Sequence, residues 1–341
     1  MKIYLKITAL FLLVVGCYPK EKTIESSFYH WQQQFDLTTL EQDYLRDLKT
    51  KKLYVRFFDV TWNEATNRPQ PVSTIHFKDS FPKGLKIIPT IYITNQTIGA
   101  CNEPQILQLA QQLYKKIQNI TTSYQLPTIQ EIQIDCDWSL STKDKFFKLL
   151  EALQTEDANL VLSATIRLHQ VKFYKKTGIP PVQRGMLMFY NMGDLQRADT
   201  KNSILDLKTA KQYLVNFDEY DLPLDVALPL FRWGVLKRRG RVVKLINHLD
   251  FKDLQDTINY SPISNTTFQV KTSHYLKGYY LYPNHEIRIE NVQLEELQAT
   301  VDLLKKEIQN QSICITYYHL DEAVLAHYTK QDLIQIEERF K

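Results

Sequence analysis

Two aspartates spaced two residues apart give the clearest chemical signal in this sequence. Asp135 and Asp137 belong to the β-rich run Glu131–Asp137, where alternate side chains share a face with Cβ atoms roughly 6.5–7 Å apart. Two carboxylates so close, and partly shielded from water, cannot both ionise freely, so the pKa of one should rise. Such a split suits acid/base work on glycosidic oxygens. Acidic pairs also occur on loops and bind cations, so the pattern needs a context.

A polar face follows this run and the next one along the chain. Polar residues alternate with apolar ones: Glu131, Gln133, Asp135 and Asp137 in the first run, and Ser163, Thr165, Arg167 and His169 in the second. In a barrel covered by helices the outward face must be apolar, which places both polar faces in the lumen and at its C-terminal mouth. The alternative is an open antiparallel sheet with one solvated face.

Arg167 and His169 continue the second polar face toward that mouth. Either side chain could bind an anionic group of a ligand, and Arg167 could instead form a structural ion pair with Asp135. For His169 the alternatives are a general base and a hydrogen-bonded histidine without chemistry.

Eight short β-rich runs, many separated by segments of helical periodicity, indicate the elements that position these residues. The alternation predicts an α/β fold, a (β/α)8 TIM barrel, with an inserted hairpin/helix segment between strands 6 and 7. The predicted strands are Leu53–Asp59, Lys86–Thr94, Glu131–Asp137, Leu160–Leu168, Gly185–Asn191, Leu224–Phe231, Gly278–Tyr282 and Ser312–Tyr317. The predicted helices are Leu37–Leu48, Pro104–Ile117, Thr142–Leu153, Leu205–Val215, Leu294–Ile308 and Gln331–Phe340.

The inserted segment spans residues 232–277 and is read as an insertion near the mouth rather than a second domain. We expect a hairpin that turns at Arg239-Gly240 and a short helix near Phe251–Asn259. Four arginines and two lysines fall within residues 232–244. They favour a solvated turn, with contact to an acidic partner as the alternative.

Several of these residues resemble motifs of the chitinase-like (family 18) glycoside hydrolases. Asp135-Cys136-Asp137-Trp138 is similar to the start of that family's D-x-D-W-E signature, and Met188-Phe189-Tyr190-Asn191 is similar to its M-x-Y-D motif. The signature is degenerate here, because Ser139 stands where the family has its proton-donating glutamate and Asn191 stands where it has an aspartate. The chain also resembles lipoproteins of Bacteroidetes-type bacteria, which implies no activity.

The resemblance implies that Asp135 and Asp137 are supporting acids and that Tyr190 contacts a sugar. If the protein is an enzyme, we expect Asp137 to be the key carboxylate, oriented by Asp135. A second acid would come from the end of another predicted strand, and the candidates are Asp59, Asp194, Glu286 and Asp321. The expected substrate contacts include aromatic rings, which stack on sugars, and polar side chains near the mouth. They are Trp138, Arg167, His169, Tyr190, Asn191, Trp233 and Tyr318.

The N-terminus resembles a bacterial lipoprotein signal. Lys2 and Lys6 precede the uncharged run Ile7–Gly16, which is too short to cross a bilayer, and Cys17 follows it as the expected lipidation site. The expected organisation is therefore a signal peptide over residues 1–16, a linker and helix over 17–50, and the barrel over 51–341. This predicts a protein of the bacterial cell envelope, bound to a membrane through a lipid at Cys17.

The composition excludes several other classes. The 341 residues are 44% hydrophobic, which supports a large core, and the net charge of +4 is too weak to indicate nucleic-acid binding. The sequence contains no phosphate-binding glycine loop, HExxH or GxSxG motif, so we expect neither a metal nor a cofactor. Two functions remain: a divergent glycoside hydrolase acting on a glycan, and a glycan-binding or scaffold lipoprotein without catalysis.

Overall fold

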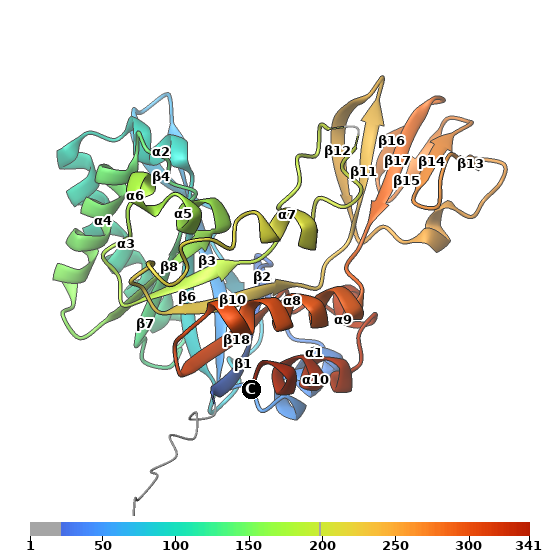
Figure 1. Cartoon of the computed structure of the whole chain (residues 1–341). Coiled ribbons are helices and arrows are strands. Elements are labelled where there is room, and N and C mark those ends of the chain that lie inside the picture. The colour runs from blue at the N-terminus through green and yellow to red at the C-terminus, as the bar shows by residue number, and fades with distance from the viewer. Residues whose placement is uncertain (1–21, 198) are drawn as a thin grey trace, which may run out of the picture.

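Eight parallel strands form a closed barrel in the computed structural model, which describes residues 22–197 and 199–341 (Figure 1). The sheet runs in the order β1-β18-β10-β9-β8-β7-β6-β3, and β1 also pairs with β3, so the ring closes. The predicted (β/α)8 barrel is confirmed and the open antiparallel alternative is wrong. The strands are β1 (Thr23–His30), β3 (Lys52–Asn63), β6 (Lys86–Ile93), β7 (Glu131–Asp135), β8 (Val161–Arg167), β9 (Arg184–Met188), β10 (Leu224–Pro229) and β18 (Ser312–Tyr318).

Helices cover the outside of the barrel, and the main core lies between them and the strands. The helix α3 shows why they form: Asn102 and Gln105 make a capping box at its start, and its apolar residues recur on one buried face. None of the described helices is long and apolar enough to cross a bilayer. The helices are α1 (Thr39–Asp47), α2 (Asn95–Ala100), α3 (Glu103–Ser123), α4 (Lys143–Glu156), α5 (Leu168–Lys172), α6 (Tyr174–Thr177), α7 (Leu207–Lys211), α8 (Leu294–Glu307), α9 (Glu322–Leu325) and α10 (Lys330–Phe340).

One barrel strand was missed by the sequence analysis, and one of the eight predicted strands is wrong. The first barrel strand is β1, inside the segment expected to be a linker, so the barrel begins at Thr23 and not at residue 51. Its adjacent polar residues Ser26 and Ser27, which face opposite sides of the strand, interrupt the apolar signal that marks the other strands. The run Gly278–Tyr282 is not in the barrel, because β16 (Tyr279–Leu281) pairs only with β15 (His274–Leu276) in a separate hairpin.

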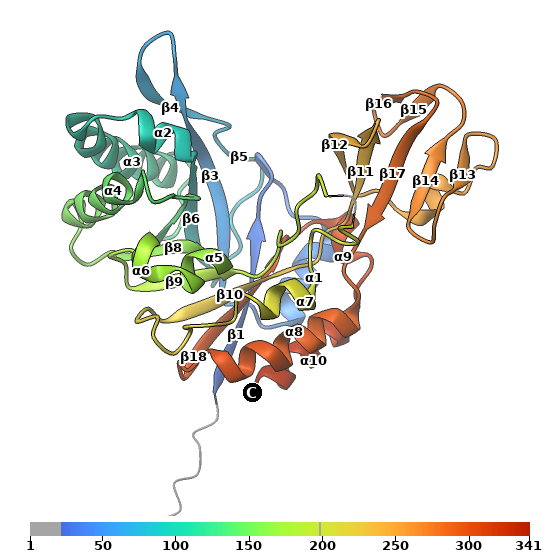
Figure 2. The same cartoon turned by 45° about the horizontal axis from the view of Figure 1, so that its top comes forward.

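The insertion therefore lies between the seventh and eighth barrel strands, β10 and β18. It contains an antiparallel sheet in the order β12-β11-β17-β14-β13 and rises from the mouth end of the barrel, opposite α2–α6 (Figure 2). The expected hairpin turn is confirmed, with Arg239 and Gly240 at φ of +49° and +73°, and the expected helix is a single 3₁₀ turn over Phe251–Leu254. The strands are β11 (Trp233–Arg238), β12 (Arg241–Asn247), β13 (Tyr260–Pro262), β14 (Thr267–Val270) and β17 (His285–Glu290).

This insertion has a hydrophobic core of its own, which the sequence did not predict. Leu236, Ile246, Leu249 and Ile287 are buried on the sheet face turned away from the polar residues of β17. Gly234 is required there, because a Cβ atom would lie 2.2 Å from Leu249 Cδ2. Three shorter strands complete the fold: β2 (Gln34–Phe35), β4 (Arg68–Val72) and β5 (His76–Phe77).

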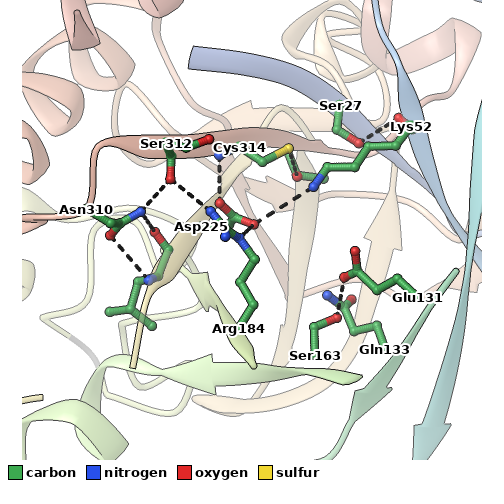
Figure 3. Close-up of polar contacts among 12 residues, drawn as sticks. Ser27, Lys52, Glu131, Gln133, Ser163, Arg184, Asp225, Asn310, Ser312 and Cys314 are labelled. Carbon is green, nitrogen blue, oxygen red and sulfur yellow. Dashed lines mark hydrogen bonds and ion pairs between the residues drawn. The ribbon is translucent and has the colours of Figure 1, made fainter. Parts of the chain in front are cut away.

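The N-terminal end of the barrel is closed by a polar network (Figure 3). Asp225 accepts hydrogen bonds from Arg184 Nε at 2.5 Å and from the Cys314 amide at 2.7 Å, and its carboxylate lies 4.0 Å from Lys52 Nζ. These residues stand near the starts of four barrel strands. Because Asp225 has partners for both oxygens, its buried charge is compensated.

Candidate functional site

The polar faces of β7 and β8 meet inside the barrel, as the sequence predicted, and pair in successive steps. Ser163 donates to Glu131 at 2.6 Å, Thr165 donates to Asp135 at 2.7 Å, and Arg167 binds Asp137. Thr165 and Arg167 continue the register that pairs Ile134 with Ala164, and so lie opposite Asp135 and Asp137, whereas Ser163 stands opposite Gln133 and reaches back to Glu131. The polar alternation thus leads from the closed end of the barrel to its mouth.

Asp135 is the last residue of β7 and lies within the lumen, only 4% exposed. Burial raises its pKa above the usual range, although the charge of Arg167 and the hydrogen bond from Thr165 oppose the shift. The prediction that one carboxyl of the pair has a raised pKa agrees with this environment. Asp135 is suited to hold a proton more readily than an ordinary aspartate.

Asp137 stands beyond the strand end and its side chain is 51% exposed. Arg167 approaches it with two nitrogens: Nε binds one carboxylate oxygen, and Nη2 lies 3.1 Å from the other. Burial disfavours the charge on Arg167, but Asp135 and Asp137 outweigh it and raise its pKa above the usual range. The alternative ion pair between Arg167 and Asp135 is replaced by this fork on Asp137.

Ser139, at the position of the family's proton donor, belongs to a hydroxyl cluster ahead of α4. Its Oγ lies 2.9 Å from Ser141 Oγ and 3.2 Å from Thr142 Oγ1, and its amide donates to Thr142 Oγ1 at 2.9 Å. These contacts order the turn that starts the helix. A serine hydroxyl cannot supply a proton as a carboxylic acid does at neutral pH.

Two adjoining cavities open at the mouth. One has a volume of about 360 Å³ and includes Asp137 and His169; the other has a volume of about 550 Å³ and includes Asp135 and Trp233. The two cavities share four lining residues, Arg167, Met188, Tyr190 and Asn191. Together they form a hollow large enough for a small-molecule ligand.

Aromatic rings form the wall of this hollow. The ring centroid of Tyr190 lies 5.3 Å from that of Tyr318 and 5.7 Å from that of Phe231. Phe231 in turn contacts Trp233 at 5.1 Å, and Tyr318 contacts Trp31 at 5.7 Å. Rings arranged in this way present apolar surfaces with polar edges, which suit the faces of sugars.

The expected substrate contacts divide into two groups. Arg167, His169, Tyr190, Asn191, Trp233 and Tyr318 all line the hollow. Trp138 does not: it is 1% exposed, stacks on Phe146 at 5.0 Å and donates to the Thr177 carbonyl at 3.0 Å. Its assignment as a sugar contact is therefore corrected to a packing role, because the strand ends before Trp138 and its ring turns outward beneath α4.

Of the four candidate second acids, only Asp321 lines the hollow. It caps α9 and accepts from Gln32 at 2.8 Å. Asp59 is paired with Arg56 on β3, and Asp194 accepts from the Gln196 amide in a loop. Glu286 lies in the insertion and lines a separate pocket.

Other residues that line the hollow were not predicted from the sequence, and their positions after strand ends explain why. Trp31 follows β1, the strand whose signal was missed, and His248 follows β12 of the insertion. His319 is half-buried beside them, with its ring 6.4 Å from that of His248. Within residues 22–197 and 199–341, no cluster of three or more His, Cys, Asp or Glu side chains suits a metal. Cys17 lies outside the described residues.

Comparison with known proteins gives the fold a context. No protein-family model matches the chain, and no curated protein matches it in sequence.

Solved structures match it over most of its length. The Bacillus cereus spore cortex-lytic enzyme SleL has a TM-score of 0.55 at 13% identity, covering 94% of this chain and 75% of that one. A chitinase from Bacteroides thetaiotaomicron has a TM-score of 0.54 at 13% identity, covering 94% and 97%. A class V chitinase variant from Nicotiana tobaccum in complex with NAG4 has a TM-score of 0.55 at 11% identity, covering 91% and 98%. The predicted resemblance in fold to chitinase-like barrels is confirmed.

Proposed function

We propose that this chain is a glycan-binding barrel of the glycoside hydrolase type, which takes an oligosaccharide at its mouth and does not cleave it. The observation that carries the proposal is the ion pair between Asp137 and Arg167 inside an aromatic hollow. Both carboxylate oxygens of Asp137 are engaged by the guanidinium of Arg167, so this side chain is placed as a hydrogen-bonding group and not as a proton donor. Ser139 beside it cannot replace the missing acid.

The fold supports a carbohydrate ligand. Structures similar to this chain include chitinases, one of them in complex with NAG4. The hollow here lies where barrels of this type bind ligands, at the C-terminal ends of the strands. Its aromatic wall supplies stacking surfaces, while Asp137, Arg167 and Asn191 supply charged and polar groups for sugar hydroxyls and amides.

A second candidate, a divergent glycoside hydrolase, is favoured by one observation. Asp135 and Asp137 occupy contrasting environments, one buried with a raised pKa and the other half-exposed and paired with Arg167. Carboxyl groups separated in this way divide the roles of acid and base in many hydrolases. Hydrolysis here would require Asp135 to deliver its proton from within the lumen.

One experiment separates the two functions. The chain from residue 18 retains every described strand and helix and is incubated with chitooligosaccharides, peptidoglycan fragments and mixed polysaccharides. Binding is followed by calorimetry and products by mass spectrometry, beside Asp137→Asn and Ser139→Glu. We expect retained oligosaccharide without cleavage. Cleavage that disappears in Asp137→Asn would replace the binding proposal with the hydrolase, and cleavage that appears only in Ser139→Glu would support the loss of an acid.

We also propose that the chain is anchored in the cell envelope through a lipid on Cys17. Only residues 18–22 separate Cys17 from Thr23, the first residue of β1, and five residues reach at most about 18 Å. Since β1 starts at the closed end of the barrel, an anchor would hold that end toward the membrane and turn the mouth away. Mass spectrometry of the membrane-extracted protein tests this; Cys17→Ala should release it, and an unmodified Cys17 would contradict it.

A further inference from the structure

A second pocket lies on the insertion, away from the barrel mouth. It has a volume of about 290 Å³ and is enclosed between the sheet of the insertion and the loop over residues 199–203. The loop is fastened to the sheet at two places, by Ser203 on Glu290 and by Gln196 on the Val242 amide. The pocket is thus built by two segments far apart in the sequence.

Cations outnumber anions around this pocket. Its lining includes Lys201, Lys237 and Arg288 against the single carboxylate of Glu286. Arg288 is ion-paired with Glu290 but retains an unused donor. Its Nε donates to Glu290 at 2.8 Å, while Nη2 is 2.5 Å from the same oxygen without the geometry of a hydrogen bond to it or to another described group. Glu290 is also shared with Ser203 and Trp233.

Lys237 is the residue that needs a partner. It is only 8% exposed, and within the described residues its ammonium makes neither a hydrogen bond nor an ion pair, although Glu286 stands directly opposite in the strand register. Burial and the positive charge of Arg288 lower the pKa of Lys237, while the charges of Glu286 and Glu290 oppose the shift. The ammonium of Lys237 is not among the fully buried unpaired atoms of the described residues, so an anion that enters the pocket can reach it.

The lining also supplies neutral donors. Ser264, Thr266 and Thr267 border the pocket with hydroxyl groups on the side open to solvent. A carboxylate or phosphate oxygen takes several such donors at once, together with lysine and arginine. The chemistry of the lining is therefore that of an oxyanion site.

The pocket lies on the same sheet face as Trp233 at the barrel mouth. Trp233, Val235 and Lys237 alternate along β11, and their register partners Glu290, Arg288 and Glu286 alternate along β17. Four residues of extended strand separate Trp233 from Lys237, a span of about 13 Å. Val235, between these two residues, is fully buried, and Ser203 of the loop is bonded to Glu290. An oligosaccharide seated at the mouth would therefore reach the pocket over this loop and not along the bare sheet.

We propose that the pocket around Lys237 and Arg288 binds an oxyanion substituent, a carboxylate or phosphate, carried by the oligosaccharide whose other sugars occupy the barrel mouth. This assigns the ligand to acidic glycans and rests on the proposed glycan-binding function. It also separates the basic residues of the hairpin into two kinds. Lys237 serves the pocket, while Arg238, Arg239 and Arg241 are exposed at the turn.

Calorimetry with four probes tests the proposal. The probes are a neutral N-acetylglucosamine tetramer, a tetramer alternating N-acetylglucosamine with carboxylate-bearing N-acetylmuramic acid, a phosphorylated tetramer, and inorganic phosphate. We expect one or both acidic tetramers to bind at least about tenfold more tightly than the neutral one, the advantage expected of a charge-assisted hydrogen bond. Which acidic tetramer gains identifies the anion.

Matched variants assign that advantage to the pocket. Lys237→Met should abolish it and leave the neutral tetramer unaffected, Lys237→Arg should restore it, and Arg241→Met, an exposed cation of the same hairpin, should leave it intact. Equal affinity for neutral and acidic tetramers overturns the pocket while the glycan-binding function stands. If the tetramers fail to bind but inorganic phosphate binds and is lost in Lys237→Met, the glycan function fails and the oxyanion site stands. No binding of any probe overturns both.

Discussion

Asp225 and Asp137 are both carboxylates at an end of the same barrel, and both are paired with arginine. The side chain of Asp225 is 1% exposed and is bound by Arg184, the Cys314 amide and, at longer range, Lys52. The side chain of Asp137 is 51% exposed and is bound by Arg167 alone among the described residues. Burial and multiple partners at the closed end indicate a structural network, whereas exposure at the mouth leaves Asp137 and Arg167 available to a ligand.

The largest effect that this comparison predicts is on stability at the closed end. Asp225→Ala leaves Arg184 and Lys52 without their shared carboxylate in a confined environment, and we expect the free energy of unfolding to fall by about 3–5 kcal/mol. Urea denaturation measures it.

Asp302→Ala is the matched control, because Asp302 is also paired with an arginine, Arg339, but on the surface. There we expect a loss of less than about 1 kcal/mol. Equal losses in the two variants would remove the distinction between a structural network and a solvated pair.

A second difference between the two ends is that the mouth end should lose stability in acid, because the buried histidine His30 lies beneath it. His30 ends β1 and is 1% exposed, and burial, aided by His319, lowers its pKa from 6.5 to about 4. Between pH 4 and 6.5, His30 therefore binds a proton in the unfolded chain but not in the folded chain. The stability that His30 contributes is present above pH 6.5 and is lost as the pH falls toward 4, by about 2–3 kcal/mol.

The measurement is the difference between wild type and His30→Phe at each pH, since other groups titrate too. Glu41, whose pKa burial raises to about 7, contributes in the opposite sense and cancels from that difference. As the pH falls from 7.5 to 4.5, the wild type should lose stability relative to His30→Phe. A difference independent of pH would show that His30 does not carry the effect.

The sequence predicted the mouth better than the rest of the molecule, for a physical reason. Alternating polar residues on β7 and β8 have few explanations in a helix-covered barrel, so Asp135, Thr165 and Arg167 could be placed in the lumen before the fold was known. Single strands gave less information. The adjacent serines of β1 weaken its apolar pattern, and the tyrosines of β16 imitate a barrel strand although their hairpin lies outside it.

Local sequence patterns did not predict which side chains of distant segments pair in the folded protein. The sequence offered Asp135 as a partner of Arg167, but the register of the two strands places Asp137 opposite Arg167. Trp138 was assigned to the sugar because it follows Asp137, yet β7 ends at Asp135 and the indole packs on Phe146. The direction of a side chain just past a strand end depends on the tertiary fold and not on spacing.

Removing the ion pair between Arg167 and Asp137 should leave the barrel folded. Arg167→Met removes the charge that opposes the raised pKa of Asp135, so that pKa should rise further, as carboxyl NMR titration would detect. We expect a smaller loss of stability than for Asp225→Ala, about 2 kcal/mol, because the exposed Asp137 remains solvated. Arg197→Met, which removes an exposed cation paired with Asp199, is the control. An unchanged Asp135 titration in Arg167→Met would mean that the guanidinium does not act on it.

The smallest effect on stability is expected at Tyr190, whose hydroxyl contacts only Met188 Sδ, at 3.6 Å, among the described residues. A tyrosine hydroxyl so weakly held in the fold remains free for a ligand, so Tyr190→Phe should change the free energy of unfolding by less than about 0.5 kcal/mol while weakening oligosaccharide binding several-fold. Tyr317→Phe reverses the pattern, because Tyr317 donates to the Leu333 carbonyl at 3.1 Å beneath α10: about 1 kcal/mol of stability should be lost with affinity unchanged. If both variants lose stability and neither loses affinity, Tyr190 belongs to the core and the sugar-binding face of the hollow lies elsewhere.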